Sequence, residues 1–316
     1  MLFRSVAFVK GNTKERPLGF AAHMDQIEPC RNVNPVINGN IISTDKTTTL
    51  GGDDKAGISA IMEAVEDIIE SGVPHRDIYL VFTCSEEISM MGTKHMDMSM
   101  LPCKELVVVD ATGGAETLAY KAPAMEAIEI TFKGKKAHAG IEPEKGINAI
   151  VVASKAISKM HIGRIDYETT SNIGHIEGGS ATNIVTDEVT FTAEIRSHSM
   201  EKLAAEVTHM EQCCKEAVEE MGACYEMKHE MAYPVLSLEE DCELIQDTVN
   251  AMAEERITAN KMIIGGGSDA NVLAGHGYKS VILGCGMINV HTVEEALDTD
   301  ETWKVTKVLR RLMGAE

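Results

Sequence analysis

Aromatic side chains and long apolar runs are both scarce in this sequence. Aromatic residues make up only 4% of the 316 residues, whereas 19 methionines are available to fill part of a core. No run approaches the roughly 20 apolar residues that a membrane-spanning helix needs. The first ten residues lack the apolar segment and cleavage site of a secretory leader. These absences argue against a membrane or secreted protein, and the 44% hydrophobic content predicts a globular protein with a sizeable core.

Basic residues and paired cysteine motifs are also scarce. The chain has 29 Lys and Arg residues against 49 Asp and Glu, a net charge of −20, which argues against binding to nucleic acid or to anionic membranes. None of the eight cysteines forms a Cys-x-x-Cys pair, and Cys84 and Cys285 stand in apolar runs, where a free thiol behaves as a small hydrophobic side chain. We therefore expect a reduced, cytoplasmic protein with no nucleic-acid or membrane partner.

Strand-like and helix-like segments alternate in the first third of the chain. Short apolar runs at 18–22, 78–83 and 106–109 have the length of buried strands, and apolar residues recur at helical spacing between 58 and 69. This alternation predicts a largely parallel α/β sheet. In such sheets, functional sites form at the carboxyl ends of the strands.

The pattern changes near residue 115. From Ile128 onwards, apolar and polar residues alternate, as they do in strands with one solvent-exposed face. The buried pattern returns after residue 231. Apolar residues of the final helix stand at helical spacing: Val305, Val308, Leu309 and Leu312. The sequence therefore predicts an α/β domain formed by residues 1–114 and 232–316, and an inserted α+β domain formed by residues 115–231.

Potential metal ligands lie at the ends of predicted strands or at the start of a helix. They are His23, Asp53, Glu87, Asp110 and, much later, His291. Zn²⁺ binds His nitrogens and carboxylate oxygens, and two ions about 3.5–4 Å apart can share one bridging carboxylate. Asp53 is the candidate bridge, because it stands between two glycines and a helix, and the other four would be terminal ligands. Glu86 is then left as the general base.

Asp25 has a supporting role in this interpretation, because it would hold the ring of His23 by a hydrogen bond. Each of these residues also has a simpler explanation when taken alone. Asp53 would be a helix N-cap, His23 a core histidine, and Glu86 with Glu87 a solvated loop. The coincidence of all of them at neighbouring strand ends favours the metal site.

Five segments also carry a family resemblance. They are His23-Met24-Asp25, Gly52 to Gly57, Glu86-Glu87, Asp110 and Gly286 to Thr292. With them the chain resembles the peptidase T-like metallopeptidases, in the co-catalytic zinc family that also contains glutamate carboxypeptidases and aminoacylases. The resemblance implies a zinc-peptidase domain holding two Zn²⁺ per subunit, with Co²⁺ or Mn²⁺ as alternatives. It also implies a cis peptide between Asp53 and Asp54. Aspartate at position 110 is typical of the aminopeptidase members, whereas the carboxypeptidase members have glutamate.

The inserted domain shares in this resemblance. In the family it is a lid that often dimerises, so a homodimer through residues 115–231 is expected. The resemblance implies that His138 stabilises the oxyanion, commonly in the partner subunit's site. It also implies that Asn183 and Arg196 bind the carboxylate of the substrate, since an arginine offers a planar fork to that group. Gly267 and Ser268 belong to a segment that resembles a second substrate-binding loop.

The function expected from these features is hydrolysis of short peptides, with tripeptides cleaved by an aminopeptidase. Two alternatives stay open: an N-acyl amino acid or dipeptide hydrolase with the same site, and a truncated, non-catalytic peptide-binding protein. The second arises because only 22 residues precede His23, whereas family members usually have a longer segment there. Either the short start is natural or it is incomplete, and absent helices would leave apolar sheet surface exposed.

Overall fold

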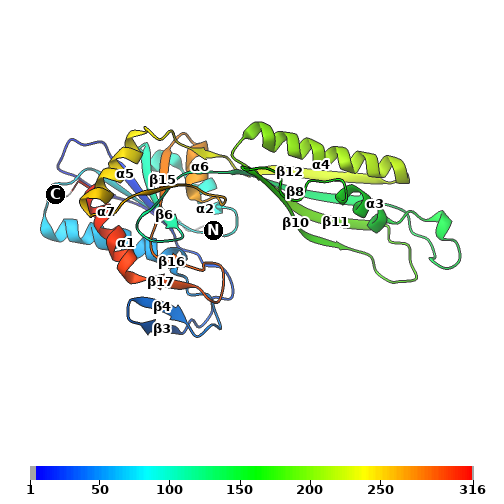
Figure 1. The fold of residues 1–316 in the computed structure, drawn as a ribbon, viewed down its shortest axis with the longest axis horizontal. Coiled ribbons are helices and arrows are strands. Elements are labelled where there is room, and N and C mark those ends of the chain that lie inside the picture. Colours follow the sequence, from blue (N-terminus) through cyan, green and yellow to red (C-terminus); the bar gives the residue numbers. More distant parts are fainter. Residues whose placement is uncertain (1–4, 315–316) are drawn as a thin grey trace. The chain divides into compact units, whose positions relative to one another are not determined.

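The computed structural model describes residues 5–314, and the chain divides into two compact units. The first unit contains both ends of the chain, up to Ala122 and from Leu236, and the second spans Pro123–Val235 (Figure 1). The sequence predicts domain boundaries at residues 115 and 231, and the divisions between the two units lie a few residues after each of them. The first boundary moves because strand β7 (Thr117–Ala122) pairs with strands of the first unit. The second moves because strand β12 (Cys224–Tyr233) stays paired within the second unit up to Tyr233.

An eight-stranded sheet forms the centre of the first unit. Its strand order is β1-β5-β2-β6-β15-β7-β13, with β14 paired to β7. Strand β2 runs parallel to both β5 and β6, and β15 runs parallel to β6, as the alternation of strands and helices predicts. The bounds are Ser5–Val9 (β1), Leu18–His23 (β2), Ile78–Thr83 (β5), Glu105–Ala111 (β6), Leu236–Ser237 (β13), Asn260–Ile263 (β14) and Lys279–Gly284 (β15).

Helices cover both faces of this sheet. Successive residues of a strand point to opposite faces, so Phe20 and Ala22 pack in the cluster that includes α1, α5 and α7, whereas Ala21 packs in the cluster that includes α6. None of the helices within residues 5–314 is long and apolar enough to cross a membrane. The bounds are Gly52–Ser71 (α1), Met91–Lys94 (α2), Glu243–Glu254 (α5), Asp269–Gly275 (α6) and Thr299–Leu312 (α7), with a 3₁₀ turn at Met98–Met100.

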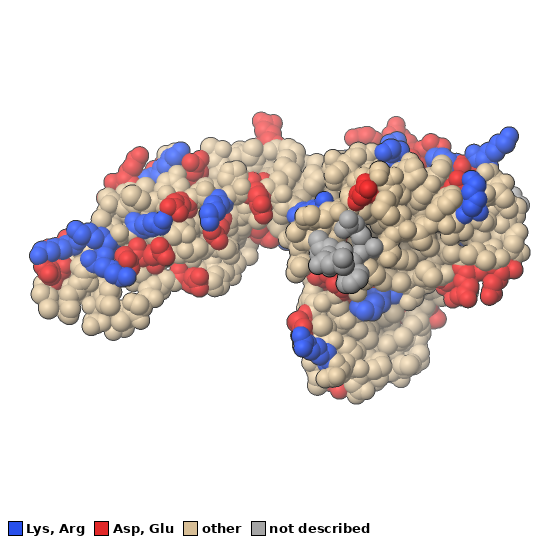
Figure 2. Space-filling model, turned by 180° about the vertical axis from the view of Figure 1, so that it is seen from behind, with Lys and Arg blue, Asp and Glu red and all other residues tan. Residues whose placement is uncertain are grey.

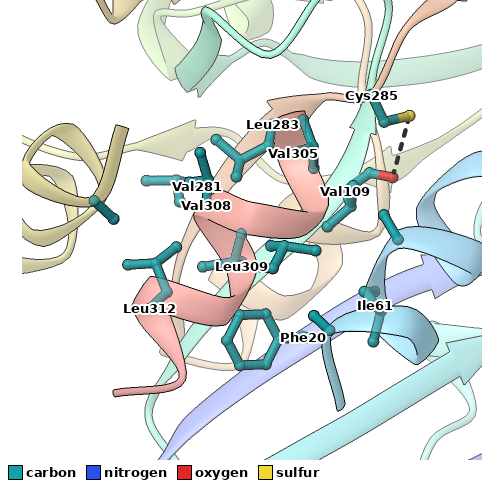
Figure 3. Close-up of a cluster of buried hydrophobic side chains, with 14 of the residues drawn as sticks. Phe20, Ile61, Val109, Val281, Leu283, Cys285, Val305, Val308, Leu309 and Leu312 are labelled. Carbon is teal, nitrogen blue, oxygen red and sulfur yellow. Dashed lines mark hydrogen bonds between the residues drawn. The ribbon is translucent and has the colours of Figure 1, made fainter. Parts of the chain in front are cut away.

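The final helix, α7, has the apolar stripe that the sequence predicts. Val305, Val308, Leu309 and Leu312 recur every three or four residues and are at most 3% exposed. Figure 3 shows these side chains clustered with Phe20, Val281 and Leu283 of the sheet and Ile61 of α1. Burying one such side chain contributes on the order of 1.5–3 kcal/mol. This layer therefore supports the strands from the side opposite α6.

A four-stranded sheet in the first unit holds the segment that carries His291. Its order is β16-β17-β4-β3, and its neighbouring strands are antiparallel. The loop between β16 and β17 contains His291. The bounds are Pro35–Asn38 (β3), Ile41–Thr44 (β4), Met287–Ile288 (β16) and Ala296–Asp298 (β17).

The second unit is a five-stranded antiparallel sheet in the order β12-β8-β11-β10-β9. Ile128, Ile130 and Phe132 are buried in a cluster with residues of α3 and α4. Lys133 on β8 alternates with these residues and pairs with Glu226. One face of the sheet is therefore apolar and the other is exposed to solvent. Acidic and basic side chains are interspersed on the side of the molecule seen in Figure 2. The bounds are Ala124–Lys133 (β8), Gly163–Arg164 (β9), Thr169–Gly178 (β10), Glu188–Ser197 (β11), Cys224–Tyr233 (β12), Ala149–Ile157 (α3) and Met200–Met221 (α4), with a 3₁₀ turn at Pro143–Lys145.

Candidate metal centre

Parallel strands bring three of the expected ligands to one edge of the large sheet. His23 is the last residue of β2, and Asp110 is the penultimate residue of β6. Glu87 lies in the loop that follows β5. Because β2 is parallel to both β5 and β6, the carboxyl ends of all three strands meet. Asp53, in the first turn of α1, and His291 complete the set.

The five side chains form two groups that share Asp53. In the first group, His23 Nε2 lies 2.9 Å from Asp53 Oδ1 and 3.6 Å from Asp110 Oδ1. In the second, His291 Nε2 lies 3.2 Å from Asp53 Oδ2 and 3.1 Å from Glu87 Oε2. Within each group one donor atom per residue lies within 4.8 Å of the others. Each oxygen of Asp53 thus faces a different group, which is the arrangement a bridging carboxylate requires.

The neighbouring carboxylate, Asp54, is directed away from these groups. The expected cis peptide between Asp53 and Asp54 is present, so this prediction is confirmed. Asp54 is fully buried, and its two oxygens accept hydrogen bonds from the backbone N–H groups of His23 and Gly57, both at 3.1 Å. Asp54 therefore fixes the end of β2 against the start of α1.

Asp25 supports both the His23 ring and the Glu86-Glu87 loop. Its carboxylate accepts hydrogen bonds from the backbone N–H groups of Glu86 (3.1 Å) and Glu87 (3.2 Å). One of its oxygens also lies 3.4 Å from His23 Nδ1. Burial would raise the pKa of Asp25, but the interactions with His23 and these N–H groups outweigh it and lower the pKa. One ionised carboxylate thus orients a ligand of the first group and the loop that carries a ligand of the second.

Buried carboxylates dominate the electrostatics of the centre. Burial, with the negative charges of Asp110 and Asp269, raises the pKa of Glu86 to about 10. Burial also raises the pKa of Asp110. For Asp53, burial is outweighed by hydrogen bonds with His23 and His291, and its pKa is lowered. Divalent cations would stabilise the ionised forms of such closely spaced carboxylates. Two imidazoles and three carboxylates are also ligand types that zinc accepts, so the residues present fit a pair of metal ions.

A cavity of about 350 Å³ opens onto this centre. Glu86 lines it beside the ligands Asp53, Asp110 and His291, so a molecule in the cavity can reach both the ligands and the expected base. Gly266, Gly267 and Ser268 form another part of the wall. The apolar part of the wall comprises Met262, Ile264, Ile282 and Val290. The wall of the cavity therefore contains both charged and apolar side chains.

Two solved structures resemble this one over 98% of the chain. The aminopeptidase PepT from Bacillus cereus is 35% identical, with a TM-score of 0.90, and 83% of its chain is covered. A tripeptidase from Staphylococcus aureus is 34% identical, with a TM-score of 0.94, and again 83% of its chain is covered. The chain belongs to the peptidase T-like family of metallopeptidases.

Sequence comparisons agree with this assignment. An uncharacterised protein of Bacillus subtilis, YqjE, is 40% identical over 304 residues, which are 96% of this chain and 82% of that protein. The Peptidase dimerisation domain matches residues 125–222, and M42 glutamyl aminopeptidase matches residues 31–141. This peptidase T-like chain is therefore an enzyme of the peptidase class, with the α/β fold and inserted domain that the sequence predicts.

The second unit of the peptidase carries His138, Asn183 and Arg196. His138 is exposed, and the segment that contains it pairs with the segment of Asn183, because the Ala139 N–H donates to Asn183 O at 2.9 Å. Arg196 lies on β11, where its guanidinium donates to both carboxylate oxygens of Glu194 at 2.9 and 3.0 Å. Arg196 thus has a carboxylate partner within its own strand, which the sequence pattern did not predict.

Ser268 and Asp269 have structural contacts that the sequence interpretation missed. Ser268 lines the cavity, but its hydroxyl accepts a hydrogen bond from the Ala270 N–H and caps α6. Asp269 is buried, and its carboxylate accepts hydrogen bonds from the hydroxyls of Thr83 and Thr93. It thereby anchors the end of β5, from which the Glu86-Glu87 loop begins. In the sequence, Asp269 directly follows a serine at the start of a helix. Ordinary helix capping explains such a pair, so the sequence did not indicate the role of Asp269.

Proposed function

We propose that this protein is an aminopeptidase that removes the N-terminal residue from short peptides, tripeptides in particular, with two divalent metal ions, Zn²⁺ by preference. The observation that carries the proposal is the shared Asp53, whose two oxygens face separate donor groups. Glu86 on the wall of the adjoining cavity adds a base within the same space. The tripeptidase from Staphylococcus aureus supports the choice of tripeptides.

In the proposed hydrolysis, different residues bind the metal ions, transfer the proton and position the site. Bound divalent ions would polarise the scissile carbonyl and lower the pKa of a water molecule. His23, Asp53, Glu87, Asp110 and His291 would hold those ions. Glu86 accepts the proton of the attacking water and passes it to the leaving amine. Asp25 keeps the loop of Glu86 in place through two backbone hydrogen bonds, and one of its carboxylate oxygens contacts the His23 ring at Nδ1.

The inserted unit is proposed to bind substrate and to form a homodimer. The match to the Peptidase dimerisation domain supports the dimer. Strand β9 pairs only with Thr170 and Ser171 of β10, so within the described residues the rest of β10 offers a free sheet edge. His138, Asn183 and Arg196 are proposed to act on the substrate, with His138 stabilising the oxyanion across the dimer.

A small substrate panel tests the proposed activity. The purified protein loaded with Zn²⁺ should release a free N-terminal residue from tripeptides and leave N-acetylated amino acids intact, as measured by chromatography of the products. Hydrolysis of the acylated amino acids without tripeptide cleavage would instead support the N-acyl amino acid hydrolase. Binding of tripeptides without any product would support the non-catalytic alternative.

Replacing Arg196 with alanine should weaken substrate use without loss of metal. A hydrogen bond to a charged group contributes about 1.5–3 kcal/mol, so kcat/KM for a tripeptide should fall by roughly 10–100-fold. Lys133→Ala, on the same sheet, is the matched control because Lys133 forms a surface pair with Glu226. Unchanged tripeptide kinetics in Arg196→Ala would show that Arg196 does not bind the substrate carboxylate.

A further inference from the structure

Glu295 is a buried glutamate whose carboxylate binds the turn that precedes Asp53. One oxygen, Oε2, accepts hydrogen bonds from the N–H groups of Leu50 (2.7 Å) and Gly51 (3.0 Å). The other, Oε1, accepts one from the N–H of Asp53 at 3.0 Å. The residue is only 2% exposed. These contacts join positions that are more than 240 residues apart in the chain.

Within residues 5–314, the hydrogen-bond donors to the Glu295 carboxylate are backbone N–H groups, and none of them is a basic side chain. A buried carboxylate is stable in such a setting only if its oxygens are well supplied with donors. Three N–H groups of a single turn meet this requirement. The side chain is thus held firmly, and it holds the turn firmly in return.

The turn that Glu295 binds has little conformational definition of its own. Gly51 has a φ of +79°, in the left-handed region that favours glycine. At Gly52 a Cβ would lie 3.2 Å from Glu295 Oε1, which is closer than nine in ten Cβ contacts in proteins. Two consecutive glycines leave the direction of Asp53 poorly fixed unless an outside group holds the backbone. Glu295 is that group.

Glu295 also belongs to the loop that carries His291. The N–H of Glu295 donates to Thr292 O at 3.1 Å, and the Thr292 hydroxyl donates to Asn289 O at 2.8 Å. His291 itself has a φ of +65°, so its position depends on the surrounding loop contacts. One carboxylate therefore connects the loop of His291 with the turn of Asp53, whose Oδ2 lies 3.2 Å from His291 Nε2.

We propose that Glu295 is a positioning residue. By holding the backbone of Asp53 in place relative to His291, it sets the geometry of the second donor group, which comprises Asp53, Glu87 and His291. This inference rests on the two-metal centre of the proposed function. Glu295 touches neither the donor atoms nor the cavity wall, so its influence passes through the backbone of both loops. Partners of this kind typically change metal affinity by about 10–100-fold when they are altered.

Glu295→Gln is the sharpest test, because it keeps the shape of the side chain. The amide has one oxygen for the turn, and its NH₂ group cannot accept a hydrogen bond from the Asp53 N–H. Glu294→Gln is the matched control, since Glu294 is the adjacent glutamate, is 55% exposed and pairs with Lys46. Metal-free samples of the parent and both variants are titrated with Zn²⁺ by calorimetry, and their thermal unfolding is followed by circular dichroism.

The expected result is two Zn²⁺ per chain for the parent and Glu294→Gln, and a second ion bound about 10–100-fold more weakly by Glu295→Gln. A merely structural role would lower the unfolding temperature of metal-free Glu295→Gln and leave both affinities unchanged, which would overturn the inference. If Glu295→Gln does not fold, Glu295→Asp undergoes the same titration, with the same two outcomes. A parent that fails to bind two ions would overturn the proposed metal centre, and the inference with it.

Discussion

Replacing Glu86 with alanine is expected to abolish most of the peptidase turnover while the metal content stays near normal. Glu86 lines the cavity beside the ligands but belongs to neither donor group. A positioned base contributes about 10²–10⁴-fold to the rate, and a base that also carries the proton to the leaving amine can exceed that range. The measurement is kcat on a tripeptide together with zinc content by atomic absorption.

The matched control for Glu86→Ala is Glu63→Ala, an exposed glutamate on α1 outside the centre. It should keep both turnover and metal. If Glu86→Ala strips the metal, Glu86 is a ligand, and the roles of the two adjacent glutamates must be exchanged. If Glu86→Ala keeps full turnover, the base is another group.

Replacing Glu87 with alanine is expected to lose metal and activity together. Its carboxylate lies 3.1 Å from His291 Nε2 and belongs to the second donor group. Without it, that group retains only His291 and the shared Asp53, too few protein ligands for a tightly held ion. Zinc content after dialysis should fall from two ions toward one, and tripeptide hydrolysis should fall with it. The zinc content of Glu86→Ala, measured in parallel, is the direct comparison because the two residues are neighbours of identical chemistry.

A Glu87→Ala protein that retains two ions and turnover would contradict its role as a ligand. If both Glu86→Ala and Glu87→Ala keep metal and activity, the catalytic interpretation of the loop after β5 fails. The non-catalytic peptide-binding alternative would then become the better account.

Sequence reasoning was effective where local patterns have direct structural consequences. The alternation of strands and helices predicted parallel strands, and parallel strands place His23, Glu87 and Asp110 at one edge. Spacing of three and four residues predicted the buried face of α7. The five ligands each follow a predicted strand or stand at the start of a helix. These positions were enough to suggest a shared centre.

Contacts between distant segments could not be predicted in this way. The pairing of β7 with β15 and β14, which moves the boundary of the inserted unit, depends on which strands meet in the sheet. The hydrogen bonds that the Glu295 carboxylate accepts from the turn at Leu50, Gly51 and Asp53 likewise have no signal in the local sequence. Such contacts are set by tertiary packing, whereas periodicity reports only which side of an element is buried.

The number of metal ions bound per chain tests the central claim most directly. Native mass spectrometry of the purified protein should show two divalent ions per chain in the parent, and neither ion held tightly in Asp53→Ala, because both donor groups depend on that carboxylate. A parent that binds a single ion, or an Asp53→Ala protein that still holds two, would contradict a centre bridged by Asp53.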